Sequence, residues 1–167
     1  MKCVLFRHGI AVDREEWKGE EAQRPLTSKG EKRAQEAAEG LVRLKIAPTH
    51  IVSSPYIRAL ETAKILKQIC RNRPELQVRD ELLPEANPEK LVQFLAGLPE
   101  EACVVCVGHE PHLGETAGVM LFGKPVEGLA LKKAGGCLIE FESGPKSGRG
   151  RLTWWLTAGQ LRTLAGD

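Results

Sequence analysis

The chain has 167 residues, and 24 basic side chains against 22 acidic ones give it a formal net charge of +2 at pH 7. Such a balanced charge does not indicate binding to nucleic acid or to an anionic membrane surface, and no apolar run approaches the roughly 20 residues of a membrane-spanning helix. The first residues also lack the pattern of a secretory signal. We therefore expect residues 1–167 to form one domain of a cytoplasmic protein.

In chain order, short apolar runs alternate with longer segments of helical periodicity. The runs at 3–6, 49–54 and 102–108 predict buried strands. Each helical segment begins beside a residue that is common at helix N-termini. The predicted helices are 28–44, preceded by Thr27; 55–69, starting with Pro55; 89–98, preceded by Asn87 and Pro88; and 112–122, preceded by Pro111. This alternation predicts a largely parallel sheet.

The last third of the chain has a different pattern. Two strand-like runs, 136–142 and 150–156, are separated by a turn-rich stretch, and a short helix is predicted at 158–165. We therefore predict an α/β fold of three layers, in which helices flank a mostly parallel central sheet and a C-terminal hairpin adds antiparallel strands at one edge.

The five cysteines do not form a disulfide framework, because their number is odd and their spacing irregular. Cys103 and Cys106 form a C-x-x-C pair, which also occurs in zinc and redox sites. Their stretch is apolar and β-branched, and residues three apart on a strand point to opposite faces. Since no second pair completes a four-ligand site, we interpret both as core residues.

Three of the predicted strands end in polar residues that suit anion binding and acid–base chemistry. These residues are Arg7 and His8 after the first strand, Ser53, Ser54 and Arg58 after the second, and Gly108 and His109 after the third. Ligands of open α/β sheets bind beyond the carboxyl ends of the strands, so we expect these side chains to form one anion pocket.

A phosphoryl group fits this pocket better than a carboxylate does. The planar fork of arginine binds phosphate oxygens in pairs, and the N–H groups at the helix start after Pro55 add partial positive charge. A neutral imidazole is a competent nucleophile toward phosphorus. The arginine charges near His8 would disfavour protonation of its ring and keep its lone pair available at neutral pH.

Three motifs of the chain resemble the histidine phosphatase superfamily, which includes the phosphoglycerate mutases. They are "FRHG", "SSPYIRALETA" and "VGHEPHL", and within the superfamily the short chain, "RPLTSKG" and "LTWWLTAGQL" are similar to SixA-type phosphohistidine phosphatases. The resemblance implies that His8 becomes transiently phosphorylated while Arg7, Arg58 and His109 hold the phosphoryl oxygens. We place Arg24, Ser54 and Glu85 among the substrate-binding residues.

The leaving group bears on the choice of substrate. Mutase-like members of the superfamily have an acidic residue that protonates the leaving group, and Glu85 is the nearest candidate, although its flanking residues match poorly. An alkoxide is about as poor a leaving group as hydroxide, whose conjugate acid has a pKa of about 15.7, whereas imidazole has a pKa of about 6.5. A site rich in arginine and poor in acids therefore favours a phosphoramidate.

The leading hypothesis is thus a phosphohistidine phosphatase, needing neither metal nor cofactor, that acts on a phosphorylated protein. The resemblance suggests the histidine-containing phosphotransfer domain of a bacterial signalling relay. The alternatives are a phosphatase of the same fold for small phosphate esters and a catalytically silent phosphoprotein-binding module. We expect a monomer.

Other residues with chemical potential receive structural interpretations. His109 and His112 lie three apart, but Pro111 and the lack of a carboxylate cluster argue against a metal site, and His112 is expected near the pocket rim. No G-x-S-x-G motif surrounds Ser53 and Ser54, so their hydroxyls are expected to organise the turn that holds Arg58. Adjacent strand residues face opposite ways, which predicts one core tryptophan and one partly exposed one at 154 and 155.

Overall fold

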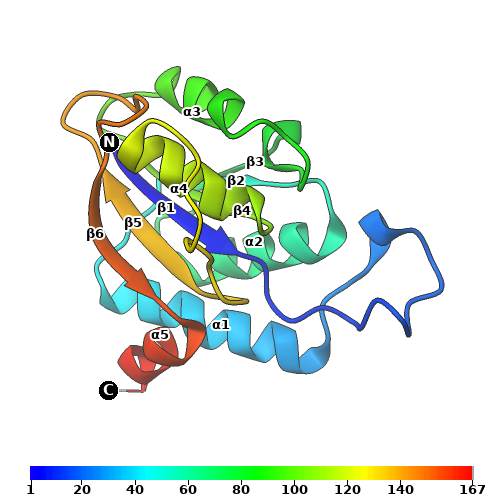
Figure 1. Cartoon of the computed structure of the whole chain (residues 1–167). Helices are drawn as coiled ribbons and strands as arrows, with labels where there is room; N and C mark the ends of the chain where they lie inside the picture. The colour runs from blue at the N-terminus through cyan, green and yellow to red at the C-terminus, as the bar shows by residue number, and fades with distance from the viewer. Residues whose placement is uncertain (167) are drawn as a thin grey trace.

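The computed structural model describes residues 1–166, in which six strands form a single sheet of order β3-β2-β4-β1-β5-β6 (Figure 1). The strands are β1 (Lys2–Arg7), β2 (His50–Ser53), β3 (Glu75–Val78), β4 (Cys103–Gly108), β5 (Gly136–Glu140) and β6 (Arg151–Leu156). The helices are α1 (Ser28–Arg43), α2 (Ile57–Ile69), α3 (Pro88–Ala96), α4 (His112–Phe122) and α5 (Ala158–Ala165), with 3-10 turns η1 (Glu21–Gln23) and η2 (Asp80–Leu82).

The sheet combines a parallel part with an antiparallel edge, as the sequence predicted. Strands β3, β2, β4 and β1 pair in parallel, β5 pairs antiparallel with β1, and β6 pairs antiparallel with β5. Every residue of β4 is buried, which is expected of a central parallel strand covered on both faces. The mixed sheet confirms the predicted hairpin.

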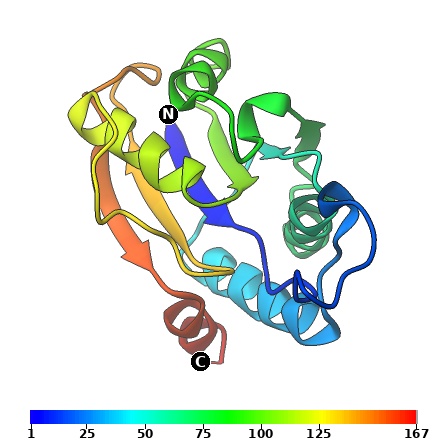
Figure 2. The ribbon, with the colours of Figure 1, turned by 45° about the vertical axis from the view of Figure 1, so that its right-hand side comes forward.

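Helices cover both faces of the sheet and give three layers (Figures 1 and 2). One core cluster joins the sheet to α3 and α4, and the other joins it to α1, α2 and α5. Alternate strand residues enter opposite clusters, so Cys106 packs in the first and Cys103 in the second. The structural interpretation of this cysteine pair is therefore confirmed, and all five cysteines are free and buried.

Local sequence signals set several helix starts. Thr27 Oγ1 accepts a hydrogen bond of 2.9 Å from Gly30 N at the start of α1, and the Asn87 side chain accepts one of 2.9 Å from Glu89 N at the start of α3. Helix α2 begins at Ile57 rather than at Pro55, which lies before the N-cap residue Tyr56. The predicted helix is correct, but its first turn lies two residues later.

Glycines allow α1 to pack closely against two other segments. A Cβ atom on Gly40 would overlap the carbonyl oxygen of Leu161 in α5, and one on Gly30 would overlap the carbonyl oxygen of Ile10. Only a residue without a side chain fits at these contacts. The second contact matters for function, because Ile10 follows the His8–Gly9 pair and α1 thereby fixes the segment just beyond β1.

Two features differ from the prediction. Strand β3 was not predicted, because its four residues mix polar and apolar types and lie half exposed at a sheet edge. Trp154 and Trp155 contact opposite core clusters as expected, but both are half-buried, since β6 is also an edge strand and neither of its faces is fully covered.

Among the described residues, no helix has the length and apolar character needed to span a membrane.

Candidate active site

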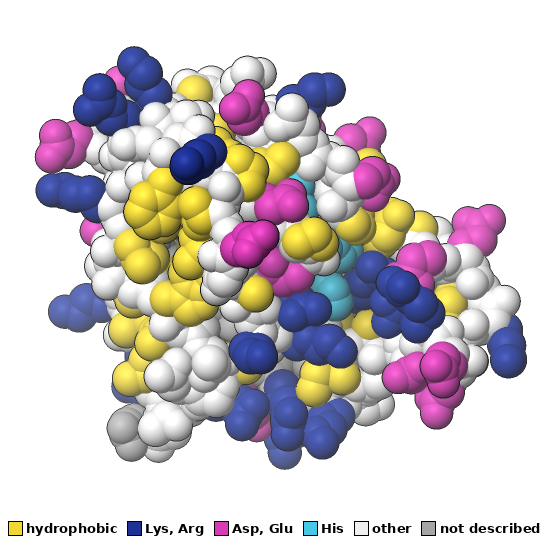
Figure 3. Space-filling model, viewed as in Figure 1, with side chains coloured by type: hydrophobic (Ala, Val, Ile, Leu, Met, Phe, Trp, Pro, Cys, Tyr) yellow, Lys and Arg dark blue, Asp and Glu magenta, His cyan; other side chains and the backbone are white. Residues whose placement is uncertain are grey.

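A cavity of about 550 Å³ lies beyond the carboxyl ends of the parallel strands. The strand ends stay joined past the sheet, because His8 N donates to Gly108 O at 3.1 Å and Ser54 N donates to Val107 O at 3.0 Å. Figure 3 shows histidine at this surface among lysine and arginine side chains. The residues that line the cavity include Arg7, His8, Arg14, Glu21, Arg24, Tyr56, Arg58, Glu85, His109, Glu110 and Lys133.

His8 is held with one ring nitrogen available for chemistry. Its Nδ1 atom lies 2.7 Å from the carbonyl oxygen of Gly9, and because a carbonyl only accepts, Nδ1 carries the proton and Nε2 carries the lone pair. Burial is the main reason that the pKa of His8 falls to about 3, with smaller contributions from the Arg58 and Arg7 charges. The lone pair expected from the sequence is thus present at neutral pH, but burial rather than arginine charge is its main cause.

Helix α2 fixes the His8 segment and Arg58 together through one buried hydroxyl. Thr62 Oγ1 donates to the carbonyl oxygen of Arg58 at 2.7 Å and accepts a hydrogen bond of 3.1 Å from Gly9 N. The Arg58 Nε–H group in turn points at His8 Nε2, at 3.4 Å. Thr62 thereby joins α2 to the segment beyond β1, through a contact between residues 53 positions apart in the chain.

His109 forms the opposite wall, with its ring centroid 5.1 Å from that of His8. Its Nε2 atom lies 2.8 Å from Ser54 Oγ, and Ser54 Oγ accepts a hydrogen bond of 3.3 Å from Tyr56 N. Burial lowers the pKa of His109 to about 2, so this ring is also neutral. Ser54 is fully buried behind His109 and orients that ring rather than lining the cavity.

Arg7 is held by backbone at the end of β1. Its Nη1 donates to Leu131 O at 2.9 Å, while its Nε is buried without a partner. Glu110 supports the same segment, because its Oε1 accepts a hydrogen bond of 2.9 Å from Leu131 N and its Oε2 one of 3.3 Å from Gly114 N. Burial raises the pKa of Glu110. This support was not predicted, since it depends on a loop more than 120 residues along the chain from Arg7.

Arg24 and Arg58 meet at one carboxylate that the sequence analysis did not identify. Glu21 Oε1 lies 2.7 Å from Arg24 Nη2 and 3.1 Å from Arg58 Nη2, and Glu21 Oε2 accepts from Arg24 Nε at 3.1 Å. The Arg24 hydrogen bond is the main reason that the pKa of Glu21 falls to about 2. The only sequence signal was the three-residue spacing of Glu21 and Arg24, which is common on protein surfaces.

The three motifs of the sequence therefore converge in space, and a comparison with known proteins identifies their origin. A family model of the histidine phosphatase superfamily (branch 1) matches residues 3–87, a range that contains Arg7, His8 and Arg58. The chain belongs to the histidine phosphatase superfamily. A relative, an uncharacterized protein of Picosynechococcus sp., is 41% identical over 149 residues, which is 86% of each chain.

Solved structures share the fold of this superfamily member. A structure of the protein histidine phosphatase SixA complexed with tungstate has a TM-score of 0.83 at 22% identity, covering 96% of this chain and 99% of that chain. Mycobacterial glucosyl-3-phosphoglycerate phosphatase has a TM-score of 0.66 at 21% identity, covering 93% and 98%. Phosphoserine phosphatase from Entamoeba histolytica has a TM-score of 0.68 at 21% identity, covering 96% and 98%. The predicted phosphoglycerate mutase-like fold is thus confirmed.

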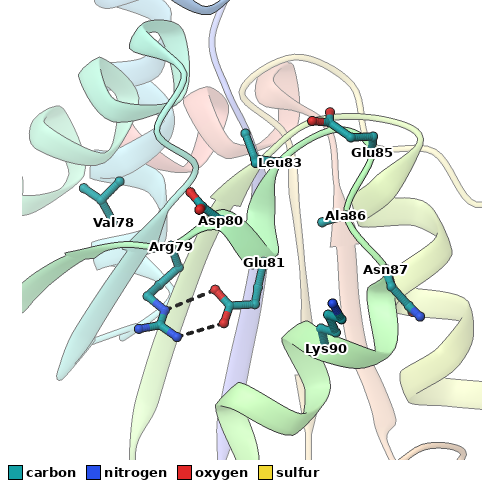
Figure 4. A pocket seen from close by; sticks show the side chains of 9 residues that line it. All are labelled: Val78, Arg79, Asp80, Glu81, Leu83, Glu85, Ala86, Asn87 and Lys90. Carbon is teal, nitrogen blue, oxygen red and sulfur yellow. Dashed lines mark hydrogen bonds and ion pairs between the residues drawn. The ribbon is translucent and has the colours of Figure 1, made fainter.

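Glu85 lies where the active-site cavity of this superfamily member meets a second cavity of about 740 Å³ (Figure 4). Its side chain is exposed and makes no hydrogen bond or ion pair within residues 1–166. Arg79 and Glu81 also line the second cavity and form a bidentate pair, with N–O distances of 3.1 and 2.8 Å. Figure 4 shows Glu85 apart from this pair. Its carboxylate is therefore free to reach a ligand.

His112 does not lie at the pocket rim, contrary to the prediction. The side chain is fully buried at the start of α4, and neither ring nitrogen has a hydrogen-bond partner. Burial lowers the pKa of His112 to about 4. The prediction was wrong because the His112 ring packs inside the fold and does not line the cavity that His109 lines, although the preceding Pro111 is exposed. In the described chain, no three His, Cys, Asp or Glu side chains gather as a metal site.

Proposed function

We propose that the protein is a phosphohistidine phosphatase that works through a covalent phosphohistidine on His8. The observation that carries this proposal is the free lone pair of His8 Nε2 at the cavity, with the Arg58 Nε–H group 3.4 Å away. A nucleophile and a guanidinium donor at this spacing suit phosphoryl transfer, in which catalysis consists mainly of positioning and electrostatic stabilisation.

In the first step, His8 Nε2 attacks phosphorus in line with the substrate's P–N bond. A new P–N bond forms to His8 as the old one breaks, and the departing imidazole keeps the electron pair and takes a proton from solvent. Arg7, Arg58 and His109 line the cavity, and in this mechanism they hold the equatorial oxygens and stabilise charge as the transferring group flattens.

In the second step, water attacks the phosphoenzyme on phosphorus. The P–N bond to His8 breaks, inorganic phosphate leaves, and the ring recovers its lone pair on Nε2. The Nδ1–H···O=C bond to Gly9 holds the ring orientation through both steps.

Two of the five acidic residues that line the cavity are not available as proton donors. Glu21 is bound to arginines, and Glu110 accepts hydrogen bonds from two backbone N–H groups. The other three, Asp13, Glu15 and Glu85, are exposed. Imidazole leaves without a strong acid because its pKa is about 6.5. Among the fold neighbours, SixA is a protein histidine phosphatase that takes up tungstate, an oxyanion. We infer a phosphorylated protein substrate, such as a phosphotransfer domain of a signalling relay, and a monomeric cytoplasmic enzyme that uses no metal.

A small phosphate ester is the second candidate substrate class, and exposed Glu85 is the observation that favours it. Two of the fold neighbours are phosphatases whose names refer to esters. If Glu85 protonates an alkoxide, Glu85→Gln slows ester hydrolysis at least tenfold, because the ester needs acid help that imidazole does not. Phosphohistidine hydrolysis should change less than twofold.

The test is a substrate profile of the purified protein. A protein labelled with ³²P on histidine and a panel of phosphate esters are each incubated with the wild type and with the Glu85→Gln variant, with and without a chelator. We expect phosphohistidine to turn over fastest and the chelator to have no effect. Faster turnover of an ester, abolished by Glu85→Gln, would establish that the substrate is a phosphate ester. Activity that the chelator removes and a divalent ion restores would overturn the metal-free mechanism. Binding of phosphoprotein without turnover would indicate a catalytically silent module.

A further inference from the structure

The segment between β1 and α1 places one of the protein's own carboxylates in the active site. Its turn η1 begins at Glu21, whose carboxylate lies between two guanidinium groups that line the cavity. Arg58 is only 4% exposed, although it carries a full charge, and Arg24 approaches from the other side of the same carboxylate. A buried cation needs a partner with good geometry, and Glu21 is the only carboxylate that pairs with Arg58 within residues 1–166.

Glu21 holds Arg58 at two points. Arg58 Nη2 lies 3.1 Å from Glu21 Oε1, and Arg58 Nη1 donates to the backbone oxygen of Glu21 at 3.0 Å. These contacts fix the plane of the guanidinium, and that plane directs Nε–H toward His8 Nε2. The orientation of the group that faces the nucleophile therefore depends on Glu21.

Glu21 also offsets a repulsion within the site. Burial is the main reason that the pKa of Arg58 is lowered, and the positive charge of Arg24 lowers it further, which means that each guanidinium disfavours the other. A carboxylate bonded to both lets the two cations remain on the same side of the cavity. Without it, like charges would separate and long side chains would regain rotamer freedom.

A count of donors distinguishes this role from simple competition with the substrate. Arginine has five N–H groups, and Arg58 uses one on Nη1 and one on Nη2 for Glu21. The Nε–H and two further N–H groups remain for phosphoryl oxygens. The 3.4 Å contact of Nε with His8 is long and is readily exchanged for an oxyanion. The substrate can therefore bind while Glu21 stays in place.

We propose that Glu21 is a positioning residue of the phosphoryl-transfer reaction, a carboxylate that holds Arg58 against His8 and keeps Arg24 beside it. The inference rests on the proposed function, because it assigns Glu21 a task only if phosphorus is transferred to His8. Glu21 itself does not touch the reacting atoms, so it acts on the transition state through Arg58.

The test compares Glu21→Gln with Glu20→Gln. Glu20 precedes Glu21 in the same segment, is exposed, does not line the cavity, and forms no ion pair in the described part of the chain, so its variant controls for the change in net charge. Glu21→Gln keeps the backbone contact with Arg58, and unfolding curves verify that both variants fold. Each substitution is made in the wild type and in Arg58→Ala, and kcat, KM and the inhibition constant of tungstate are measured.

We expect Glu21→Gln to lower kcat about tenfold or more, while tungstate affinity falls no more than about twofold because the site has gained positive charge. In the Arg58→Ala background, Glu21→Gln should cost less than about twofold, because the residue through which it acts is absent. A kcat within twofold of that of Glu20→Gln would overturn the proposal. So would an equal loss in the Arg58→Ala background, or a rise in both kcat and tungstate affinity, which would make Glu21 a competing anion.

A failure of the proposed function gives a different result. In that case the wild-type protein forms no phosphoenzyme and releases no phosphate from any substrate, before Glu21 is changed. If Glu21→Gln does not fold, Glu21→Asp retains the charge and shortens the side chain, and the same comparison with Arg58→Ala applies. An equal loss for Glu21→Asp in both backgrounds would again overturn the proposal.

Discussion

The two walls of the active site are built by different interactions. On the sheet side, the side chains of His8, His109 and Arg7 are each held by an uncharged group, namely the Gly9 carbonyl, the Ser54 hydroxyl and the Leu131 carbonyl. On the segment side, Glu21 holds Arg24 and Arg58 through ion pairs. His8 and His109 on the sheet side are buried, whereas Glu21 has a side chain that is 36% exposed.

This difference places the proposed nucleophile among uncharged partners, while charge stabilisation is shared by both sides. Burial keeps the two imidazoles neutral, and hydrogen bonds to uncharged groups orient them. A neutral ring is what a nucleophile requires. Ion pairs hold cations where negative charge gathers during phosphoryl transfer, but exposed pairs are screened by salt. Loss of His8 on the sheet side should therefore abolish the reaction, and substitutions on the segment side should change how fast it occurs.

The largest effect is expected from His8→Ala on the sheet side. The substitution removes the only atom that can bond to phosphorus in the proposed mechanism, so turnover and the acid-labile phosphoenzyme should both disappear. The measurement is ³²P transfer to the protein, followed by phosphate release. Tungstate binding should persist, because the arginines remain. Retained turnover would show that a different nucleophile operates.

The next largest effect is expected from Arg58→Ala. Loss of a preorganised donor beside the nucleophile should cost about 2 to 4 kcal/mol of transition-state stabilisation, measured as kcat/KM. Thr62 remains to hold Gly9, so the His8 segment should keep its position. A phosphoenzyme that forms at the wild-type rate would remove Arg58 from the catalytic site.

A smaller effect is expected from Arg24→Ala on the outer part of the segment side. Arg24 lines the cavity but is anchored to Glu21 and to the Val12 carbonyl, so its loss should lower kcat/KM only about tenfold. Because this wall depends on ion pairs, the activity of the wild type should also fall as salt rises, and the variant should be less salt-sensitive. Equal salt dependence of both proteins would contradict the contrast between the walls.

The smallest effect on activity, but a clear one on acid stability, is expected from His112→Leu. The folded-state pKa of His112 is about 4, below its usual value of 6.5, so the unfolded chain binds a proton more readily between these pH values. This histidine therefore destabilises the fold as the pH falls from 7 to 4. Between pH 7 and pH 4, His112→Leu should therefore lose about 2 to 3 kcal/mol less of its free energy of unfolding than the wild type loses.

Urea unfolding of both proteins at pH 7 and pH 4 measures this difference. His8 and His109 have lowered pKa values too, so the variant keeps part of the acid sensitivity. If the free energy of unfolding falls by the same amount between pH 7 and pH 4 in both proteins, the His112 ring is not buried as a neutral group.

Sequence patterns predicted the fold and the strand ends because both follow from local rules. Periodicity identified five of the six strands and all five helices, and the topology rule for α/β sheets placed Arg7, His8 and His109 at one edge. Strand β3 was missed because an edge strand needs no continuous apolar run. His112 was misplaced because nothing local distinguishes a ring that turns into the core from one that faces the cavity.

By itself, the sequence determined the α/β architecture and the residues that gather at the sheet edge, since hydrophobic period and chain order are sufficient for these. The tertiary structure decided the tautomer of His8, the burial that keeps it neutral, and the partnership of Glu21 with Arg58, whose backbone contact joins residues 37 positions apart. The physical reason is distance. Hydrogen bonds, desolvation and ion pairs act over a few ångströms in space, and a linear sequence does not specify which side chains meet at that range.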